Sequence, residues 1–231
     1  MVQQKNKTKV VSVIIPAYNE EKTIANVVRT ANKNKNVDEV IVVDDGSEDD
    51  TFQEAKQVGA KVITLPENKG KATAMDHGVV NAKNNIICFL DADIENMNNK
   101  TLNKIIEPVT SEKYDMFIGI CGRLKDKMNN LLLLLPKLGG QRVLTKEIWN
   151  YVPKTYKQDF QIELALNYYT KINNKRMGMK VFNDLNHIAK EKKYGLVTGF
   201  FERIKMYYDV MEISIKLYIY ETLKQKIRSI L

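Results

Sequence analysis

Cysteine, histidine and long apolar runs are scarce in this chain of 231 residues. Its two cysteines, Cys88 and Cys121, lie in apolar segments, so we expect buried thiols in a reducing compartment and no disulfide framework. The longest conspicuous apolar run, Leu131 to Leu135, is far shorter than the roughly 18 residues that cross a bilayer. The first ten residues are polar and basic, without the apolar core of a secretory signal. These absences predict a cytoplasmic protein, either soluble or peripheral at the cytoplasmic face of a membrane.

Several nucleotide-binding and nucleic-acid-binding signatures are also missing. No G-x-G-x-x-G follows the first predicted strand, which argues against a nicotinamide enzyme. A nucleotidyltransferase would typically have a glycine-rich loop with Arg or Lys at the same point, and none is present. The aromatic residues are not interleaved with lysines, and no helix-turn-helix, zinc-finger or RNP pattern occurs, so no nucleic-acid partner is expected. The net charge of +8 therefore favours another anionic partner, either a phosphorylated ligand or a membrane surface.

Apolar segments of strand length alternate with helical patterns through the first half of the chain. This alternation predicts βαβ units, a mostly parallel sheet and one α/β domain. After residue 121 the pattern becomes irregular, until a helix is predicted for 156–172, a strand for 177–182 and a long helix from 199 onward. The strands predicted in the first half are 10–16, 37–45, 60–65, 85–90 and 115–120, and the helices are 20–35, 51–59 and 71–83.

The predicted strands end in polar segments. PAYNEE, DDGSEDDT, PENKGKA and DADIE follow the first four strands in turn. Ligands of open parallel sheets bind beyond the carboxyl ends of the strands. We therefore expect one site assembled from these segments at one edge of the sheet.

The segment DADIE places Asp91, Asp93 and Glu95 at alternate positions after an apolar strand. If the extended conformation persists, the three carboxylates share a face and need a cation between them. Magnesium and manganese prefer such oxygen ligands and commonly bind together with phosphates. The alternative is a polar turn in which an aspartate caps the next helix.

Two other segments offer groups for a nucleoside. Asp45 could accept hydrogen bonds from a base or a ribose, while Gly46 permits a tight turn; the alternative is a turn that caps the helix at Thr51. Tyr18 could lie against a base and Glu20 could accept from a sugar ring.

Lys71 stands at the start of a predicted helix, in the segment ENKGKATAM. A lysine at a helix N-terminus suits a phosphate group. A solvated turn is the alternative for this segment.

Together VSVIIPAYNEE, VVDDGSEDDT, ENKGKATAM and FLDADIE, at these separations, resemble family-2 glycosyltransferases of GT-A fold. The nearest likeness is to polyprenyl-phosphate sugar transferases, and it is specific over roughly residues 10–120. The resemblance implies a GT-A α/β domain, a nucleoside-diphosphate-sugar donor, Mg²⁺ or Mn²⁺ as cofactor, and a lipid-linked or polyprenyl-phosphate acceptor. It assigns Pro16, Tyr18, Glu20, Asp45 and Gly46 to the nucleoside, Lys71 and Asp91 to the nucleotide sugar, and Asp91, Asp93, Glu95 and His187 to the metal.

The acceptor side matches the family less well. By rough position, Arg123 and Arg142 are candidates for gripping an acceptor phosphate, and Arg142 is also a candidate catalytic residue. In KQDFQIE, Asp159 could match the family's base, although Gln158 replaces the usual glutamate; Glu163, one helical turn on, is its rival. An alcohol acceptor needs a base to remove its proton, whereas an ionised lipid phosphate needs none. Both acceptor classes stay open, as does a non-catalytic GT-A-like module of a membrane complex.

Residues 199–231 form a separate amphipathic pattern after the domain predicted for 1–198. Its apolar arc is wider than packing on one neighbour requires, while Lys205, Asp209, Glu212 and Lys216 form a polar stripe. Such a helix could pack on the domain, form a homodimer or contact a membrane surface.

Overall fold

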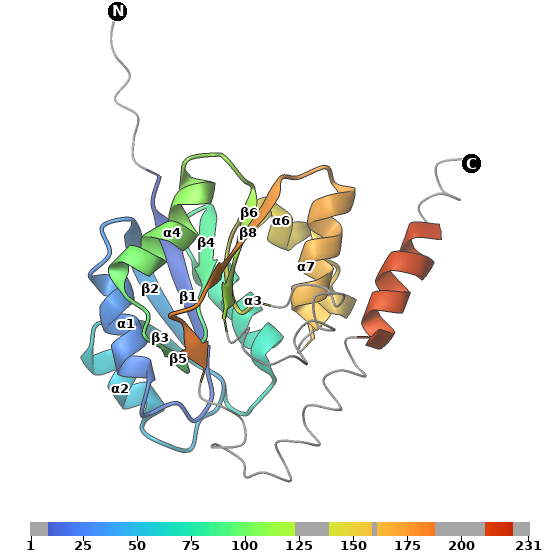
Figure 1. Cartoon of the computed structure of the whole chain (residues 1–231). Coiled ribbons are helices and arrows are strands. Elements are labelled where there is room, and N and C mark those ends of the chain that lie inside the picture. The colour runs from blue at the N-terminus through green and yellow to red at the C-terminus, as the bar shows by residue number, and fades with distance from the viewer. Residues whose placement is uncertain (1–8, 123–138, 159–160, 188–210, 224–231) are drawn as a thin grey trace, which may run out of the picture.

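The computed structural model describes residues 9–122, 139–158, 161–187 and 211–223, which form a sheet covered by helices (Figure 1). The strands are β1 (Val11–Ala17), β2 (Val37–Asp44), β3 (Lys61–Thr64), β4 (Ile86–Phe89), β5 (Ile94–Glu95), β6 (Met116–Cys121), β7 (Gln141–Thr145), β8 (Met177–Phe182) and β9 (Asn186–His187). The α-helices are α1 (Ile24–Asn32), α2 (Thr51–Gln57), α3 (Lys71–Asn81), α4 (Asn99–Thr110), α6 (Lys146–Tyr151) and α7 (Gln161–Ile172). A 3₁₀ turn covers Lys154–Tyr156, and residues 211–223 are helical, with a π-type segment at Lys216–Glu221.

Within the described residues the main sheet has the order β3-β2-β1-β4-β7-β6-β8. Strands β3, β2, β1 and β4 are parallel to one another, and β6 is parallel to β8. Strand β7 lies between β4 and β6 and is antiparallel to both. The predicted mostly parallel α/β sheet is therefore confirmed, with one reversed strand inside it.

The prediction of irregular structure after residue 121 is wrong for residues 141–151, which form β7 and α6. The first two residues of β7 are Gln141 and Arg142, yet they are 0% and 1% exposed. A strand that begins with two polar residues lacks the apolar signature of a buried strand, which is why the pattern missed it. The helix predicted from residue 156 begins instead at Gln161.

The sheet separates two apolar layers. Alternate side chains of β1 point to opposite faces, so Ile14 packs with α3, α6 and α7, while Val13 and Ile15 pack with α1 and α4. Figure 1 shows these helices on the two sides of the sheet. Ile213 and Leu217 of the helix at 211–223 join the layer formed by α3, α6 and α7. The predicted arrangement of helices on both faces is confirmed.

None of the helices in the described ranges is long and apolar enough to cross a bilayer.

Candidate functional site

The loops after β1 and β2 are joined at the carboxyl edge of the sheet. The backbone N–H groups of Asn19 and Glu20 donate to the hydroxyls of Ser47 (3.0 Å) and Thr51 (2.7 Å). Tyr18, next to these two hydrogen bonds in the chain, is 36% exposed. Pro16, near the end of β1, and Glu20 are half-buried. Tyr18 and Glu20, two of the residues expected to hold a nucleoside, thus lie in a loop that is hydrogen-bonded to the loop after β2.

The sequence suggested Asp45 as a ligand for a nucleoside, but in the structure its carboxylate is buried and bonds to the backbone of a neighbouring loop. Asp45 is 3% exposed, and its two carboxylate oxygens accept hydrogen bonds from the backbone N–H groups of Lys69 and Gly70, both at 2.9 Å. Gly46 has φ +74°, and a Cβ there would lie 2.7 Å from the carbonyl carbon of Glu67. Only glycine fits this turn without strain. Asp45 and Gly46 therefore hold the loop from which α3, with Lys71 at its first position, begins.

Lys71 is the centre of a charged cluster. Its Nζ lies 2.6 Å from Oδ1 of Asp91 and 3.3 Å from Oε1 of Glu163. The lysine side chain is 33% exposed, whereas those of Asp91 and Glu163 are 15% and 8% exposed. Burial alone would lower the pKa of Lys71, but the two carboxylates outweigh it and raise that pKa above its ordinary value. The lysine is therefore a permanent cation at the edge of the site.

Asp91 is fixed by residues that the sequence analysis did not single out. The amide of Gln141 donates to Oδ2 of Asp91 (2.8 Å) and accepts from the Asp91 backbone N–H (3.0 Å). A Cβ on Gly140 would overlap the Asp91 carboxylate. The signal was the segment GGQR, whose glycines admit a close approach and whose glutamine can both donate and accept.

Arg142 lies beneath Glu163 instead of facing solvent. It is 1% exposed; its Nη1 donates to the Glu163 carbonyl oxygen (3.3 Å) and to Oδ1 of Asn167 (3.2 Å), and its Nη2 is 3.8 Å from the Glu163 carboxylate. Burial lowers the pKa of Arg142, an effect opposed by Glu163 and Asp91, but a guanidinium stays protonated at neutral pH. The sequence suggested Arg142 as a ligand for an acceptor phosphate and as a candidate catalytic residue; the structure places its guanidinium in the interior, against α7.

The acidic segment after β4 forms a turn, but the next helix, α4, is capped by Asn98 and not by an aspartate. The chain turns at Ala92 and Asp93, then forms the short strand β5, which pairs antiparallel with β9. In this pairing Ile94 lies opposite His187, so the backbone brings the late histidine next to the acidic segment.

The carboxylates of this segment do not gather into a ready metal cluster. Asp93 is half-buried and Glu95 is exposed. Among the described residues, no three Asp, Glu, His or Cys side chains meet in an arrangement that could hold a metal ion. The expected three-carboxylate convergence is therefore not present in this part of the chain. Arg123 and Asp159 lie outside the described residues.

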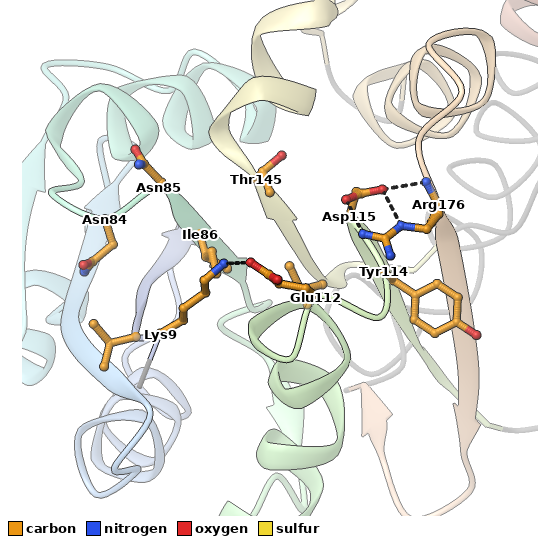
Figure 2. A pocket seen from close by; sticks show the side chains of 11 residues that line it. Lys9, Asn84, Asn85, Ile86, Glu112, Tyr114, Asp115, Thr145 and Arg176 are labelled. Atoms are coloured by element: carbon orange, nitrogen blue, oxygen red, sulfur yellow. Dashed lines mark hydrogen bonds and ion pairs between the residues drawn. The ribbon is translucent and has the colours of Figure 1, made fainter. Parts of the chain in front are cut away.

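A hollow lies at the opposite edge of the sheet, where the parallel strands begin (Figure 2). Its volume is about 680 Å³, and Thr145, Asn84 and Asn85 are among the residues that line it. The charged side chains on its wall are paired with one another: Lys9 with Glu112, and Arg176 with Asp115. None of the residues expected at the site lines this pocket, so we assign it no part in the chemistry.

Comparison with known proteins identifies the group to which this arrangement belongs. A family model described as glycosyl transferase family 2 matches residues 12–174. The chain belongs to this family. The match covers β1 to α7 and so includes Lys71, Asp91 and Glu163.

Three curated relatives illustrate the family's range. A 4,4'-diaponeurosporenoate glycosyltransferase of Staphylococcus haemolyticus is 36% identical over 49% of this chain and 32% of its own. A UDP-N-acetylglucosamine–dolichyl-phosphate N-acetylglucosaminyltransferase of Methanococcus voltae is 32% identical over 62% of this chain and 59% of its own. A glucosyl-3-phosphoglycerate synthase of Mycolicibacterium smegmatis is 28% identical over 70% of this chain and 65% of its own. This chain thus spans between about a third and two thirds of the length of these relatives.

A crystal structure shares the fold. Glucosyl-3-phosphoglycerate synthase from Mycobacterium tuberculosis, in complex with Mn²⁺, uridine diphosphate and glucosyl-3-phosphoglycerate, gives a TM-score of 0.66 at 23% identity. The likeness covers 78% of this chain and 72% of that one. The GT-A fold expected from the sequence is confirmed.

Proposed function

We propose that this chain transfers a sugar from a nucleoside-diphosphate sugar to a lipid-linked acceptor, with the help of a divalent cation. The main supporting observation is that Lys71, Asp91 and Glu163, from three separate parts of the chain, meet at the carboxyl edge of the sheet. That edge is where ligands of open α/β sheets bind. The relatives named above, which act on dolichyl phosphate and on diaponeurosporenoate, support a lipid acceptor.

Asp91 and Asp93 are the residues that would hold a hard cation shared with a diphosphate. Asp91 and Asp93 offer carboxylate oxygens of the kind that Mg²⁺ and Mn²⁺ prefer, and a site with so few protein ligands leaves positions for phosphate oxygens. Glu95 and His187 are further candidate ligands from the same two-stranded sheet. When bound, the cation would neutralise charge that develops on the departing diphosphate.

Lys71 would stabilise the same leaving group, the departing diphosphate. Because its ammonium stays protonated, it can stabilise the growing negative charge without any proton transfer. The loop held by Asp45 and Gly46 fixes the start of α3 and therefore the position of this cation. Tyr18 and Glu20, along the joined loops, are the candidates for contacting the nucleoside.

Glu163 is the candidate base among the described residues, with Asp159 as its rival outside them. For a hydroxyl acceptor, the oxygen would attack the anomeric carbon while its proton passes to the carboxylate. The bond from that carbon to the diphosphate oxygen breaks, and its electron pair leaves with the nucleoside diphosphate. Arg142 would act through Glu163, by holding its backbone and carboxylate from below.

A soluble hydroxyl-bearing acceptor is the second candidate, and one observation favours it. A carboxylate poised beside Lys71 is needed for an alcohol acceptor but not for an ionised phosphate. The similarity to glucosyl-3-phosphoglycerate synthase over 70% of this chain agrees with this alternative.

Transfer from radiolabelled nucleotide sugars tests the proposal. Purified protein with Mn²⁺ is offered UDP- and GDP-sugars together with a polyprenyl phosphate, a lipid alcohol or 3-phosphoglycerate, and the labelled product is identified. We expect metal-dependent transfer to a lipid acceptor from one donor class. Transfer that is equally fast with chelator present would contradict the metal role, and lack of turnover with every donor would contradict the activity.

The variant Glu163→Gln separates the two acceptor classes. Loss of a general base typically lowers the rate by about 10²- to 10⁴-fold, so we expect such a loss if the acceptor is a hydroxyl. With an ionised phosphate acceptor the variant should keep most of its turnover. Nucleotide binding, followed by thermal shift, serves as the control and should be retained in either case.

A further inference from the structure

Exposed apolar side chains concentrate on one helix of this chain. Of the eight large hydrophobic side chains that are exposed in the described residues, five belong to the helix at 211–223. Tyr218 is 40% exposed; the other four, which are 53% to 56% exposed, form what we call the outer face: Met211, Ile215, Ile219 and Leu223.

The same helix is anchored to the domain by its other side. Ile213 and Leu217 are 4% and 0% exposed and join the core that includes α7. Tyr218 packs edge-on against Tyr168 of α7, with ring centroids 5.2 Å apart, and the Tyr168 hydroxyl is 3.2 Å from that of Thr222. Packing on the domain therefore accounts for the inner side of the helix, which runs beside α7 (Figure 1), while the four side chains of the outer face stay more than half exposed within the described residues.

The charge of the neighbouring sequence indicates what covers this face. The last ten residues of the sequence contain Lys224, Lys226 and Arg228 and no acidic residue. On the other flank, residues 188–210 contain five basic and three acidic residues. A second copy of the chain would bring two basic flanks together, whereas an anionic lipid surface attracts them. An apolar helical face beside basic segments is the usual composition of an interfacial helix.

We propose that the outer face of the helix at 211–223 binds the surface of an anionic lipid membrane. The helix would lie in the membrane interface with Ile215 and Ile219 at its centre, while Ile213 and Leu217 keep the catalytic domain attached. The contact between Tyr218 and Tyr168 lies about 7.5 Å along α7 from Glu163, because each helical residue rises about 1.5 Å. Membrane binding would thus bring the candidate base close to the lipid surface. Only this last step depends on the proposed function.

Vesicle sedimentation tests the surface directly. The chain is mixed with vesicles of phosphatidylcholine alone or with phosphatidylglycerol added, and the double variant Ile215→Glu/Ile219→Glu is compared with wild type. Both side chains are exposed, so the variant should fold. The matched control is Val80→Glu on α3, where a 77% exposed valine lies on another helix.

We expect wild type and the Val80 variant to bind the anionic vesicles, and the double variant to bind at least about tenfold more weakly. Equal binding by all three proteins would overturn the proposal. The proposal would also be overturned if light scattering showed that wild type is a dimer and the double variant a monomer. A second copy of the chain would then cover the outer face. Nucleotide-dependent thermal shifts of the same variants report on the donor site separately: their absence in every variant and wild type would overturn the proposed function and leave the membrane result standing.

Discussion

The Glu163 carboxylate lies near two cationic side chains, those of Lys71 and Arg142. Lys71 approaches Glu163 from the solvent edge, and Arg142 lies beneath it. Removal of one member of a buried ion pair leaves an uncompensated charge, which costs far more than loss of an exposed pair. At the scale of single residues, Arg142 should therefore matter for stability as well as for the site.

We expect Arg142→Met to lower the free energy of unfolding by about 3 kcal/mol, since Glu163 would lose its buried partner. Urea denaturation measures the change. The control is Arg176→Met, which removes an arginine that is 57% exposed and paired with Asp115; its cost should stay below about 1 kcal/mol. Equal effects for the two variants would show that the buried arginine does not stabilise Glu163 as described.

At the scale of secondary-structure elements, β7 organises the site. Gln141 clamps Asp91, and its neighbour Arg142 supports Glu163, so one strand end positions both carboxylates that flank Lys71. This strand runs antiparallel between β4 and β6 and so presents its first residues at the edge where β4 ends.

We expect Gln141→Leu to raise the Mn²⁺ concentration needed for nucleotide binding about tenfold, because a hydrogen bond to a charged group contributes roughly 1.5 kcal/mol. A Mn²⁺ titration of the nucleotide-induced thermal shift measures the effect. Thr145→Val, at the other end of β7, is the matched control, because the buried Thr145 hydroxyl has no hydrogen-bond partner in the described structure. An unchanged Mn²⁺ requirement in the Gln141 variant would argue against its role.

The elements that sequence alone predicted and those it missed differ in a physical way. β1, β2 and β4 are apolar runs bounded by polar turns, and such runs are recognisable without tertiary context. β7 is buried by its place in the sheet, and its polar first residues form hydrogen bonds with Asp91 and Glu163, 50 and 21 positions away in the chain. The pairing of Lys71 with Glu163, 92 residues apart, is equally beyond local pattern. The acidic motif and the lysine could be predicted, but the residues that hold them could not.

At the scale of the whole molecule, charged side chains are arranged differently at the two edges of the sheet. The carboxyl edge gathers Lys71, Asp91 and Glu163, while charged side chains at the other edge pair with one another (Figure 2). Hydrogen bonds from Arg176 hold the pKa of Asp115 below its ordinary value of 3.8.

This lowered pKa predicts a pH dependence for the pocket edge. Because the folded state holds the Asp115 proton less tightly, the stabilisation is fully present above the unfolded pKa and is lost as pH falls through the folded one. We therefore expect Asp115→Asn to be less stable than wild type at pH 6 by less than about 1 kcal/mol, with a difference that shrinks below about pH 4. Thermal unfolding across this pH range measures it. A difference that grows on acidification would contradict the assignment.

The most direct test of the donor site is a thermal-shift screen of UDP, GDP, CDP and dTDP, each with and without Mn²⁺, on wild type, Asp91→Asn and Asp115→Asn. A ligand that binds only the folded state raises the melting temperature by mass action. We predict a Mn²⁺-dependent shift with one nucleotide in wild type and in Asp115→Asn, and its loss in Asp91→Asn. A shift that survives in Asp91→Asn, or no shift with any nucleotide, would contradict a metal-assisted nucleotide-sugar site at the carboxyl edge of the sheet.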